Sequence, residues 1–429
     1  MRTWLPVLLA VGGLVGFTPY LGAAAQSLPT SEAASGPSSA SKHPSLFELR
    51  SDDGSRTIRF KGRIQLDTGW VGDSADATSD GTPSGTRFGT EHDSEIRSLQ
   101  LGIQGELGDH IAYKAGYIRA GGSSKMTDSY VAFRAAGFRL SLGQMREAAS
   151  MEEETGAPNL NLLERAAFTD AWDFRRRVGV GFGYDADNVV VEAAVQTDNL
   201  FQDKPERDRY ALSARAIVLP IAEKTRMVHL GVYALRRVRQ RDPGPGEIRA
   251  VGYDVRPAIH DLDQRFVETG QIPASGDHVY GAEFAALEGS LNATAEASVL
   301  TVDSTVAGVP DPRFWGGYVE IGYFLTGEVR PYEAHQWGHI RPKSPIGAGG
   351  FGAVQVVVRI DYLDLESPRA AIYGGRQLAY LVGVNWHPVE LLKLMANVGL
   401  LKISNGPAYR DASGDNTVDV AGLRAQINW

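Results

Sequence analysis

Three cations stand at alternate positions in one short segment, at Arg59, Lys61 and Arg63. Successive side chains of a β-strand point to opposite faces, so these three would share one face at a spacing of about 6–7 Å. Rows of Arg and Lys attract anions and replace part of their hydration. The guanidinium group also binds phosphate or carboxylate oxygens in a bidentate manner. If this segment is extended, its spacing predicts a surface along which anions bind or move.

The same alternation places charged side chains on the polar faces of other predicted strands. Lys114, Arg215 and Arg359 are such residues, and Asp361 follows Arg359 on the same face, where it is placed to pair with it. The alternative for any one of these residues is that it only solvates a wide polar interior. For the row at 59, 61 and 63 taken as a group, we favour a role in selecting anions.

A different charged region is the segment 148–176, which shows no alternation. Arg146 precedes it, the acidic run Glu152–Glu154 lies near its start, and it is followed by Arg177 after Arg175 and Arg176. Charges at the narrowest point of a water-filled path act strongly on passing ions. We expect 148–176 to fold inward as a constriction, although a solvated loop would also carry such an acidic run.

The chain offers little for catalysis or for metal binding. It has no cysteine, which excludes a thiolate zinc site and a cysteine nucleophile. Gly-x-Ser-x-Gly, Walker and His-Glu-x-x-His motifs are absent from the sequence. His335 and His339 have a spacing that could bind a metal on a helix, but Pro331 and Gly338 predict a loop. We therefore expect no catalytic residue, no metal and no cofactor.

Along the chain, the alternation of apolar and polar residues predicts sixteen β-strands. In 57–71, for example, Ile58, Phe60 and Leu66 lie on the face opposite to the three cations. The strands that we predict span residues 57–71, 95–107, 111–120, 126–137, 138–147, 177–185, 188–197, 208–219, 227–238, 277–287, 289–303, 313–327, 350–365, 376–388, 390–403 and 417–429.

The predicted connections are of two lengths. Gly108-Asp109 and Glu288-Gly289-Ser290 are tight turns. The long polar connections are 72–94, 148–176, 239–276, 328–349 and 404–416. Short periplasmic turns at one end and long extracellular loops at the other are typical of a transmembrane antiparallel β-barrel. Aromatic residues near the predicted strand ends fit the girdles of such a barrel, although they could also fill the core of a soluble sandwich.

The chain ends on an amphipathic strand whose last residue is Trp429. Leu423, Ala425 and Ile427 share its face, and Arg424 and Gln426 lie on the other. A terminal strand that stops on an aromatic residue looks like the signal by which outer-membrane barrels are assembled. We therefore expect the barrel assembly machinery to recognise it.

The N-terminal residues predict export. Residues 1–25 have the features of a signal peptide, with Arg2, an apolar stretch from Leu5 to Val15, and Ala23-Ala24-Ala25 before the cleavage point. Residues 26–55 form a segment rich in Ser, Ala and Pro, and 56–429 form the barrel domain. No apolar run after residue 25 is long enough for a membrane helix. The formal charge of −8 argues against a nucleic-acid partner.

Several short motifs occur in one order and resemble those of the phosphate-selective porin O/P family of Gram-negative outer membranes. The resemblance covers essentially all of residues 46–429. The motifs lie at Gly62–Asp67, Ile96-Arg97, Asp128–Val131, Gly143–Glu147, Arg265–Gly270, Tyr323–Tyr332, Gly374-Gly375 and Gly383–Trp386.

The resemblance implies a homotrimer of sixteen-stranded barrels embedded in outer-membrane lipid, each passing anions such as phosphate or polyphosphate along basic side chains. By its place in the family's motif, Arg97 corresponds to the basic residue at the start of the second strand. Asp128 is the acid of the Asp-x-Tyr-Val motif, and Arg146 is the basic residue beside the inward loop. The family often has a second basic residue next to Arg97, where this chain has Ser98. A general solute porin without phosphate selectivity therefore stays an alternative.

Two other functional classes remain open at this point. A barrel enzyme such as an outer-membrane lipase or protease needs a Ser/His or Asp/His constellation at the rim, and we cannot assemble one from the sequence. A secreted β-rich adhesin has no need of the terminal aromatic strand. The porin interpretation is the one that accounts for the cations, the alternation and the chain end together.

Overall fold

The computed structural model describes residues 47–73, 91–120, 123–198, 200, 208–239, 250–260, 265–407 and 416–429. All belong to one compact unit that spans Ser45–Trp429. The expected signal peptide 1–25 and residues 26–46 of the segment behind it lie outside these ranges, so the export prediction stays a prediction. Within residues 47–55, a short strand forms, β1 (Glu48–Arg50).

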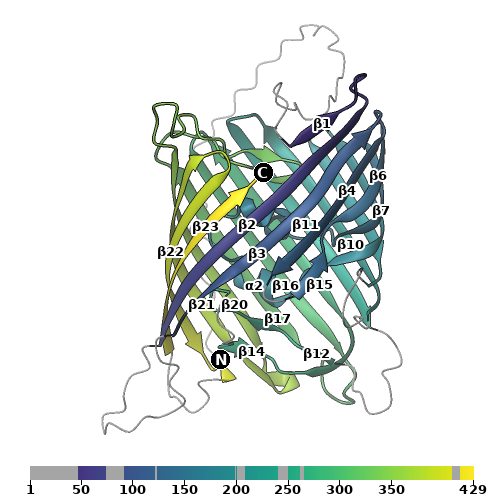
Figure 1. The fold of residues 1–429 in the computed structure, drawn as a ribbon. Helices are drawn as coiled ribbons and strands as arrows, with labels where there is room; N and C mark the ends of the chain where they lie inside the picture. The colour runs from purple at the N-terminus through teal and green to yellow at the C-terminus, as the bar shows by residue number, and fades with distance from the viewer. Residues whose placement is uncertain are drawn as a thin grey trace, which may run out of the picture. The chain divides into compact units, whose positions relative to one another are not determined.

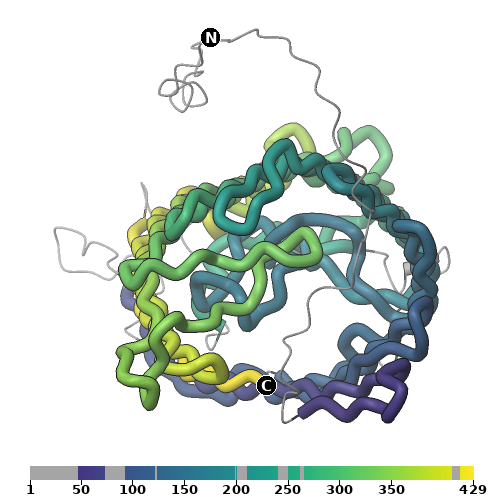
Figure 2. Tube along the Cα trace, turned by 90° about the horizontal axis from the view of Figure 1, so that it is seen from above, coloured from purple at the N-terminus to yellow at the C-terminus, as the bar shows by residue number. Residues whose placement is uncertain are grey.

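The described residues build a closed antiparallel β-barrel of sixteen strands, in which the first strand, β2, pairs with the last, β23 (Figures 1 and 2). This confirms the predicted fold class. The fourth barrel strand is interrupted and consists of β5 and β6. The barrel strands are β2 (Arg56–Asp73), β3 (Glu91–Leu107), β4 (Ile111–Ala120), β5 (Ser123–Met126), β6 (Ser129–Ala135), β7 (Phe138–Arg146), β8 (Arg176–Ala186), β9 (Val189–Gln196), β10 (Asp208–Ala222), β11 (Arg226–Arg239), β15 (Ile272–Glu288), β16 (Leu291–Ser304), β17 (Arg313–Phe324), β20 (Ala353–Ser367), β21 (Ile372–Val389), β22 (Leu392–Ser404) and β23 (Asn416–Asn428).

Alternation sorts the side chains of each strand onto the two faces of the barrel wall. On β2, Leu66 is 49% exposed on the outer face, whereas its neighbours Gln65 and Asp67 are buried on the inner face. β17 repeats the pattern, with Val319 exposed outside and Glu320 buried inside. An apolar outer face and a polar inner face are what a lipid-embedded barrel requires. In the described part of the chain, no helix is long and apolar enough to cross a membrane.

One end of the barrel carries tight turns together with the C-terminus, and we call it the turn end. Gly108-Asp109 and Gly289-Ser290 lie there, and β2 begins and β23 ends there. The other end carries most of the long connections, and we call it the loop end. The connection between β11 and β15 belongs to this end and contains β12 (Ala250–Val251), β13 (Asp254–Val255) and β14 (Val267–Glu268).

One long connection departs from this division. Residues 325–352, which join β17 to β20, leave and re-enter the barrel wall at the turn end. They contain a small hairpin, β18 (Tyr332–Glu333) and β19 (Gln336–Trp337). Figure 2 shows this green segment reaching across the opening of the barrel. We call it the turn-end insertion.

The connection between β7 and β8 folds into the barrel, as predicted for 148–176, and we call residues 147–175 the inner loop. It contains α1 (Met151–Glu154), the 3₁₀ turn η1 (Ala157–Asn159) and α2 (Ala167–Ala171). Phe168 and Trp172 are fully buried in an apolar cluster with wall residues such as Phe314. A second 3₁₀ turn, η2 (Pro368–Ala370), joins β20 to β21. The inner loop is therefore held inside the lumen by its own apolar side chains.

Candidate functional site

The inner loop is tied to one side of the barrel by a buried ionic network. Arg359 on β20 contacts Glu152 of the loop at 2.5 Å and Glu320 of β17 at 2.6 Å. Asp361, two residues further along β20, accepts a hydrogen bond from the backbone of Ala167 at 2.8 Å. The predicted pairing of Arg359 with Asp361 does not form, because each residue binds the inner loop instead.

The irregular backbone of the inner loop receives hydrogen bonds from the barrel wall and from the turn-end insertion. Carbonyl groups outside regular structure need partners when they are buried. Six carbonyl groups between residues 158 and 164 accept from side chains outside the loop: Pro158 from Gln426, Asn159 from Arg330, Leu160 from Lys393, Asn161 from Asn385, Leu163 from Arg424 and Glu164 from Arg359.

The turn-end insertion meets the inner loop inside the lumen. Its Trp337 accepts a hydrogen bond from Asn159 at 3.2 Å, and the guanidinium group of Arg330 lies 4.4 Å from the centre of the Trp337 ring. Burial lowers the pKa of Arg330 to about 10, although Glu320 opposes this shift. Arg330 remains charged at neutral pH and joins the insertion to the inner loop.

The predicted cation row on β2 faces the lumen, but its three members differ. Arg59 pairs with Glu48 of β1 at 2.6 Å. Lys61 is exposed to the lumen, and neither it nor Arg63 has an ion-pair partner within the described ranges. Arg63 is 9% exposed and donates a hydrogen bond to Ser98 at 3.2 Å. The four charges that act on it most strongly are the guanidinium groups of Arg424, Arg97, Arg176 and Arg146.

A β-bulge on β3 directs Arg97 into the lumen. Gln65 pairs with Ser98, whereas Leu66 pairs with Ile96, so Arg97 is an additional residue in the ladder. By simple alternation Arg97 would share the outer face with Leu99 and Leu101, which are exposed there. A bulge reorients side chains in this way. Arg97 instead forms two hydrogen bonds of 3.1 Å with Glu164 of the inner loop.

Three carboxylates on this side of the lumen are each shared by two cations. Asp128 contacts Lys114 and Arg176, both at 2.7 Å. In the inner loop, Glu153 lies 3.1 Å from Arg165 and 3.8 Å from Arg146. Glu164 contacts Arg97 and Arg424, and Arg424 also pairs with Asp67 at 2.6 Å. Within the described ranges, these six cations contact five carboxylates in all, counting Glu95 at 3.9 Å from Arg97. We therefore infer that this wall carries more positive than negative charge.

Two carboxyl groups of the inner loop differ in their pKa. Burial raises the pKa of Glu164, but the guanidinium groups of Arg97 and Arg424 outweigh it and hold this pKa at about 2. Burial raises the pKa of Glu154 to about 7, and Arg146 opposes it only in part. At neutral pH, Glu164 is therefore ionised and Glu154 is close to half protonated.

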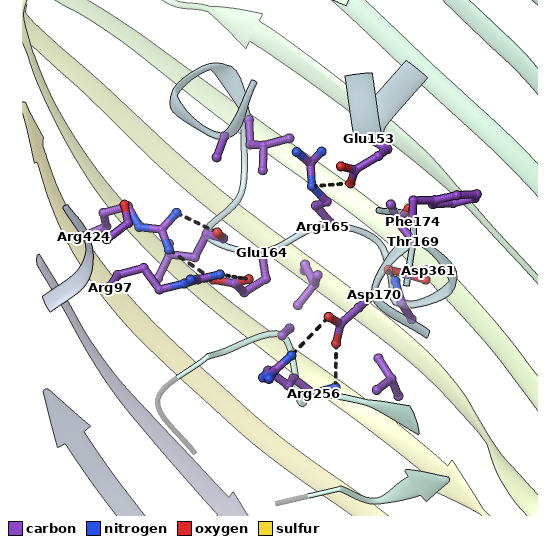
Figure 3. A pocket seen from close by; sticks show the side chains of 18 of the residues that line it. Arg97, Glu153, Glu164, Arg165, Thr169, Asp170, Phe174, Arg256, Asp361 and Arg424 are labelled. Carbon is purple, nitrogen blue, oxygen red and sulfur yellow. Dashed lines mark hydrogen bonds and ion pairs between the residues drawn. The ribbon is translucent and has the colours of Figure 1, made fainter. Parts of the chain in front are cut away.

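A cavity of about 260 Å³ lies between the inner loop and this wall. Its lining includes Arg63 and Ser98 from the wall, Glu164 and Arg165 from the inner loop, and Arg256 from the connection between β11 and β15. Figure 3 shows Arg97 and Arg424 meeting Glu164 on one side, and Arg256 meeting Asp170 at 3.3 Å on another. The cavity is thus lined by side chains that bind anions and by carboxylates.

Comparison with known proteins agrees with this geometry. Residues 64–429 match the model of the family described as phosphate-selective porin O and P. The chain belongs to this family. It is an outer-membrane porin, a channel rather than an enzyme by its family and fold, and its location is the outer membrane.

Individual relatives of this porin are distant. An uncharacterized protein of Caulobacter vibrioides is 33% identical over 385 residues, which covers 88% of this chain and 75% of that protein. Porin O of Pseudomonas aeruginosa is 23% identical over 304 residues, which covers 64% of this chain and 68% of Porin O.

Solved structures share the fold at low sequence identity. OmpT of Vibrio cholerae superimposes with a TM-score of 0.54 at 12% identity, covering 89% of this chain and 99% of OmpT. The anion-selective porin from Comamonas acidovorans has a TM-score of 0.51 at 9% identity, covering 87% of this chain and all of that porin.

The structure gathers most of the predicted lumen residues of the porin on one wall. Arg63, Arg97, Lys114, Asp128 and Arg146 lie there, each with the partners described above. Arg59 lies at the turn end. Arg215 and Arg359 also face inward but are held by carboxylates, with Arg215 only 2.8 Å from Glu283. Their proposed place in an ion path therefore changes to a proposed structural role.

Some residues at the site were not predicted from the sequence. Arg424 lies on the polar face of the terminal strand, so its inward direction was visible, but its contact with the inner loop was not. The same holds for Lys393, which alternates with Leu392 and Leu394 in the predicted strand 390–403. Glu164 and Arg165 carried no signal, because their roles depend on how an irregular loop lies in the lumen. His335 and His339 occupy the turn-end insertion, where His335 lies 3.3 Å from Asp185.

Proposed function

We propose that this porin forms a water-filled channel through which small anions, with phosphate as the leading candidate, diffuse passively along the wall formed by β2, β3, β4, β7 and β8. The observation that supports it most is that Lys61 and Arg63 face the lumen without an ion-pair partner among the described residues. Of the charged groups around Arg63, other arginines act on it most strongly, which supports a positive potential on this side of the cavity.

Reversal potentials in a KCl gradient across planar bilayers test this proposal. We expect chloride to be preferred over potassium, with Arg63→Gln lowering the permeability ratio several-fold. Lys402→Gln is the matched control, because Lys402 is exposed on β22 between two inward, buried residues and therefore faces outward. A preference for potassium in the wild type, or equal effects of the two substitutions, would contradict the proposal.

A general solute porin without phosphate selectivity is the second candidate. Carboxylates such as Asp170 and Asp361 also line the cavity, and they weaken its attraction for multivalent anions. A permeability ratio near one, with no block of the chloride current by phosphate, is the result that favours this candidate.

We also propose that the protein assembles as a homotrimer and that the barrel assembly machinery recognises the strand ending in Trp429. A trimer form of OmpT from Vibrio cholerae, which has the same fold, supports the first point. Gel migration of detergent-extracted protein before and after heating tests it, and a species that migrates as a monomer without heating would contradict it.

A further inference from the structure

The cavity beside the inner loop has an apolar part that inorganic anions would not use. Leu160, Leu163 and Phe174 of the inner loop contribute to its lining, as do Ile118 of β4 and Leu381 of β21. Ile118 and Leu381 both lie on inward positions of their strands, where a polar residue is typical of a porin lumen. Val255, in the connection between β11 and β15, also lines the cavity. The apolar part is therefore formed by four separate segments: the inner loop, β4, β21 and this connection.

The size of the cavity also exceeds the need of a small oxyanion. Its volume of about 260 Å³ is roughly twenty times the ~10–15 Å³ that holds one water molecule. A solute of several heavy atoms beyond the anionic group therefore fits between the inner loop and the wall.

The charges around the cavity favour a solute with one anionic group over a solute with several. Arg97, Arg165 and Arg256 are each paired with a carboxylate of the inner loop. Arg63 is the lining cation that, within the described residues, makes a hydrogen bond to a hydroxyl group and no ion pair. A carboxylate or phosphate can be held at Arg63, whereas the surrounding carboxylates repel further negative charge on the same solute.

We propose that this cavity selects organic anions that combine one phosphate or carboxylate group with an apolar body, in preference to inorganic phosphate. This inference rests on the proposed anion-channel function and names its substrate class. The anionic group lies at Arg63, and the apolar body lies against Leu163, Leu381 and the side chains next to them.

The test compares three phosphates as blockers of the chloride current through the full-length protein in planar bilayers at pH 8. The probes are inorganic phosphate, glycerol 3-phosphate with a polar body, and phenyl phosphate with an apolar body. We expect phenyl phosphate to block at about fivefold lower concentration than glycerol 3-phosphate, the effect of shielding a few tens of Å² of apolar surface. Inorganic phosphate should block no better than glycerol 3-phosphate.

Two variants locate the effect. Leu381→Gln is expected to remove the preference for phenyl phosphate and to leave the block by inorganic phosphate unchanged. Met395→Gln is the control, because Met395 is buried on the inner face of β22 but does not line the cavity. Heat-modifiable gel migration of both variants checks that each barrel is folded.

The outcomes separate this inference from the proposed function. Equal block by all three phosphates in an anion-selective channel would overturn the inference and leave the channel function standing. Persistence of the preference in folded Leu381→Gln would overturn the assignment to this cavity. Absence of anion selectivity, with no block by any probe, would overturn both.

Discussion

Arg63 differs from the other lumen arginines in its ion-pair partners. Arg215, Arg359 and Arg424 are buried, and each contacts two carboxylates within 4 Å. Such pairs hold their surroundings in place but offer little charge to a passing ion. Arg63 keeps its charge without a carboxylate partner in the described part of the structure, so selectivity depends more on this residue than on the number of lumen arginines.

The ionisation of Glu154 makes the lumen charge depend on pH near neutrality. With a pKa of about 7, Glu154 is negative at pH 8.5 and neutral at pH 5.5. The charges that act on it are those of Arg146, Glu192, Arg215 and Asp128. Lowering the pH removes a negative charge, so we expect the chloride-to-potassium permeability ratio to rise by up to about twofold. Reversal potentials at the two pH values measure this change, and Glu154→Gln should reduce it.

Arg97 and Glu164 are expected to balance each other's charge in the lumen. In Arg97→Gln, Glu164 keeps Arg424 as a partner and stays ionised, so the lumen loses one positive charge and anion preference falls. In the double variant Arg97→Gln with Glu164→Gln, the charge is balanced again and the permeability ratio should recover towards the wild-type value. Reversal potentials of the two single variants and the double variant form the cycle. A double variant whose permeability ratio stays as low as that of Arg97→Gln would contradict this balance of charges.

At the scale of elements, the strands were predictable because one face of each strand meets water and the other meets apolar surroundings, so polar and apolar side chains must alternate. The predicted boundaries of β2, β9 and β11 lie within two residues of the observed ones. The bulge at Arg97 interrupts the alternation, because two polar residues separate the outward Ile96 and Leu99, but the pattern alone does not say which of the two polar residues is the additional one. The contacts of the inner loop could not be predicted from the sequence either, because hydrophobic periodicity says nothing about an irregular segment.

The place of the turn-end insertion could have been predicted by counting. In an up-and-down barrel, connections after odd-numbered and even-numbered strands lie at opposite ends. Residues 328–349 follow the twelfth predicted strand, as the tight turn Gly108-Asp109 follows the second, so both belong to one end. Length alone suggested that this segment lies with the other long loops, and that expectation was wrong.

The position of the inner loop is expected to depend on Arg359. In Arg359→Met, Glu152 and Glu320 lose their shared partner, and an unpaired buried charge typically costs about 3–5 kcal/mol. The barrel should remain closed, because its strand pairing is untouched, but the inner loop should detach. We expect a noisier open-channel current and faster proteolysis within residues 147–175. Arg376→Met is the control, because Arg376 pairs with Asp364 and Glu366 and is half-exposed. Identical traces from both variants would show that Arg359 does not anchor the loop.

For the whole molecule, closure of the barrel depends on how the last residue meets the first strand. Trp429 and Gly62 exchange two backbone hydrogen bonds of 3.1 Å, and the Phe47 ring lies 6.2 Å from that of Trp429. A Cβ atom on Gly62 would lie 1.9 Å from the nearest atom of the Trp429 ring. Gly62 therefore provides the space that the terminal aromatic ring occupies.

Gly62→Ala is expected to displace the Trp429 ring and weaken the seam between β2 and β23. We expect slower assembly and loss of the folded gel band at a temperature lower by several degrees. Gly72→Ala is a matched control on the same strand, since a Cβ there would meet its nearest atom only at 4.0 Å. Equal thermal stability of the two variants would contradict this role of Gly62.

The hydrogen bonds that hold the inner loop bear on how the channel responds to voltage. Residues 148–175 carry six carboxyl groups and two guanidinium groups, so a membrane potential exerts force on the loop. Moving a net charge of four across a full 100 mV amounts to about 9 kcal/mol, an upper bound for any smaller displacement. Six side chains donate hydrogen bonds to its carbonyl groups, and four of these donors are charged. Hydrogen bonds from charged donors contribute about 1.5–3 kcal/mol each. We therefore expect these hydrogen bonds from the barrel wall and the turn-end insertion to hold the loop in place, so that the pore stays open while the potential across the membrane changes.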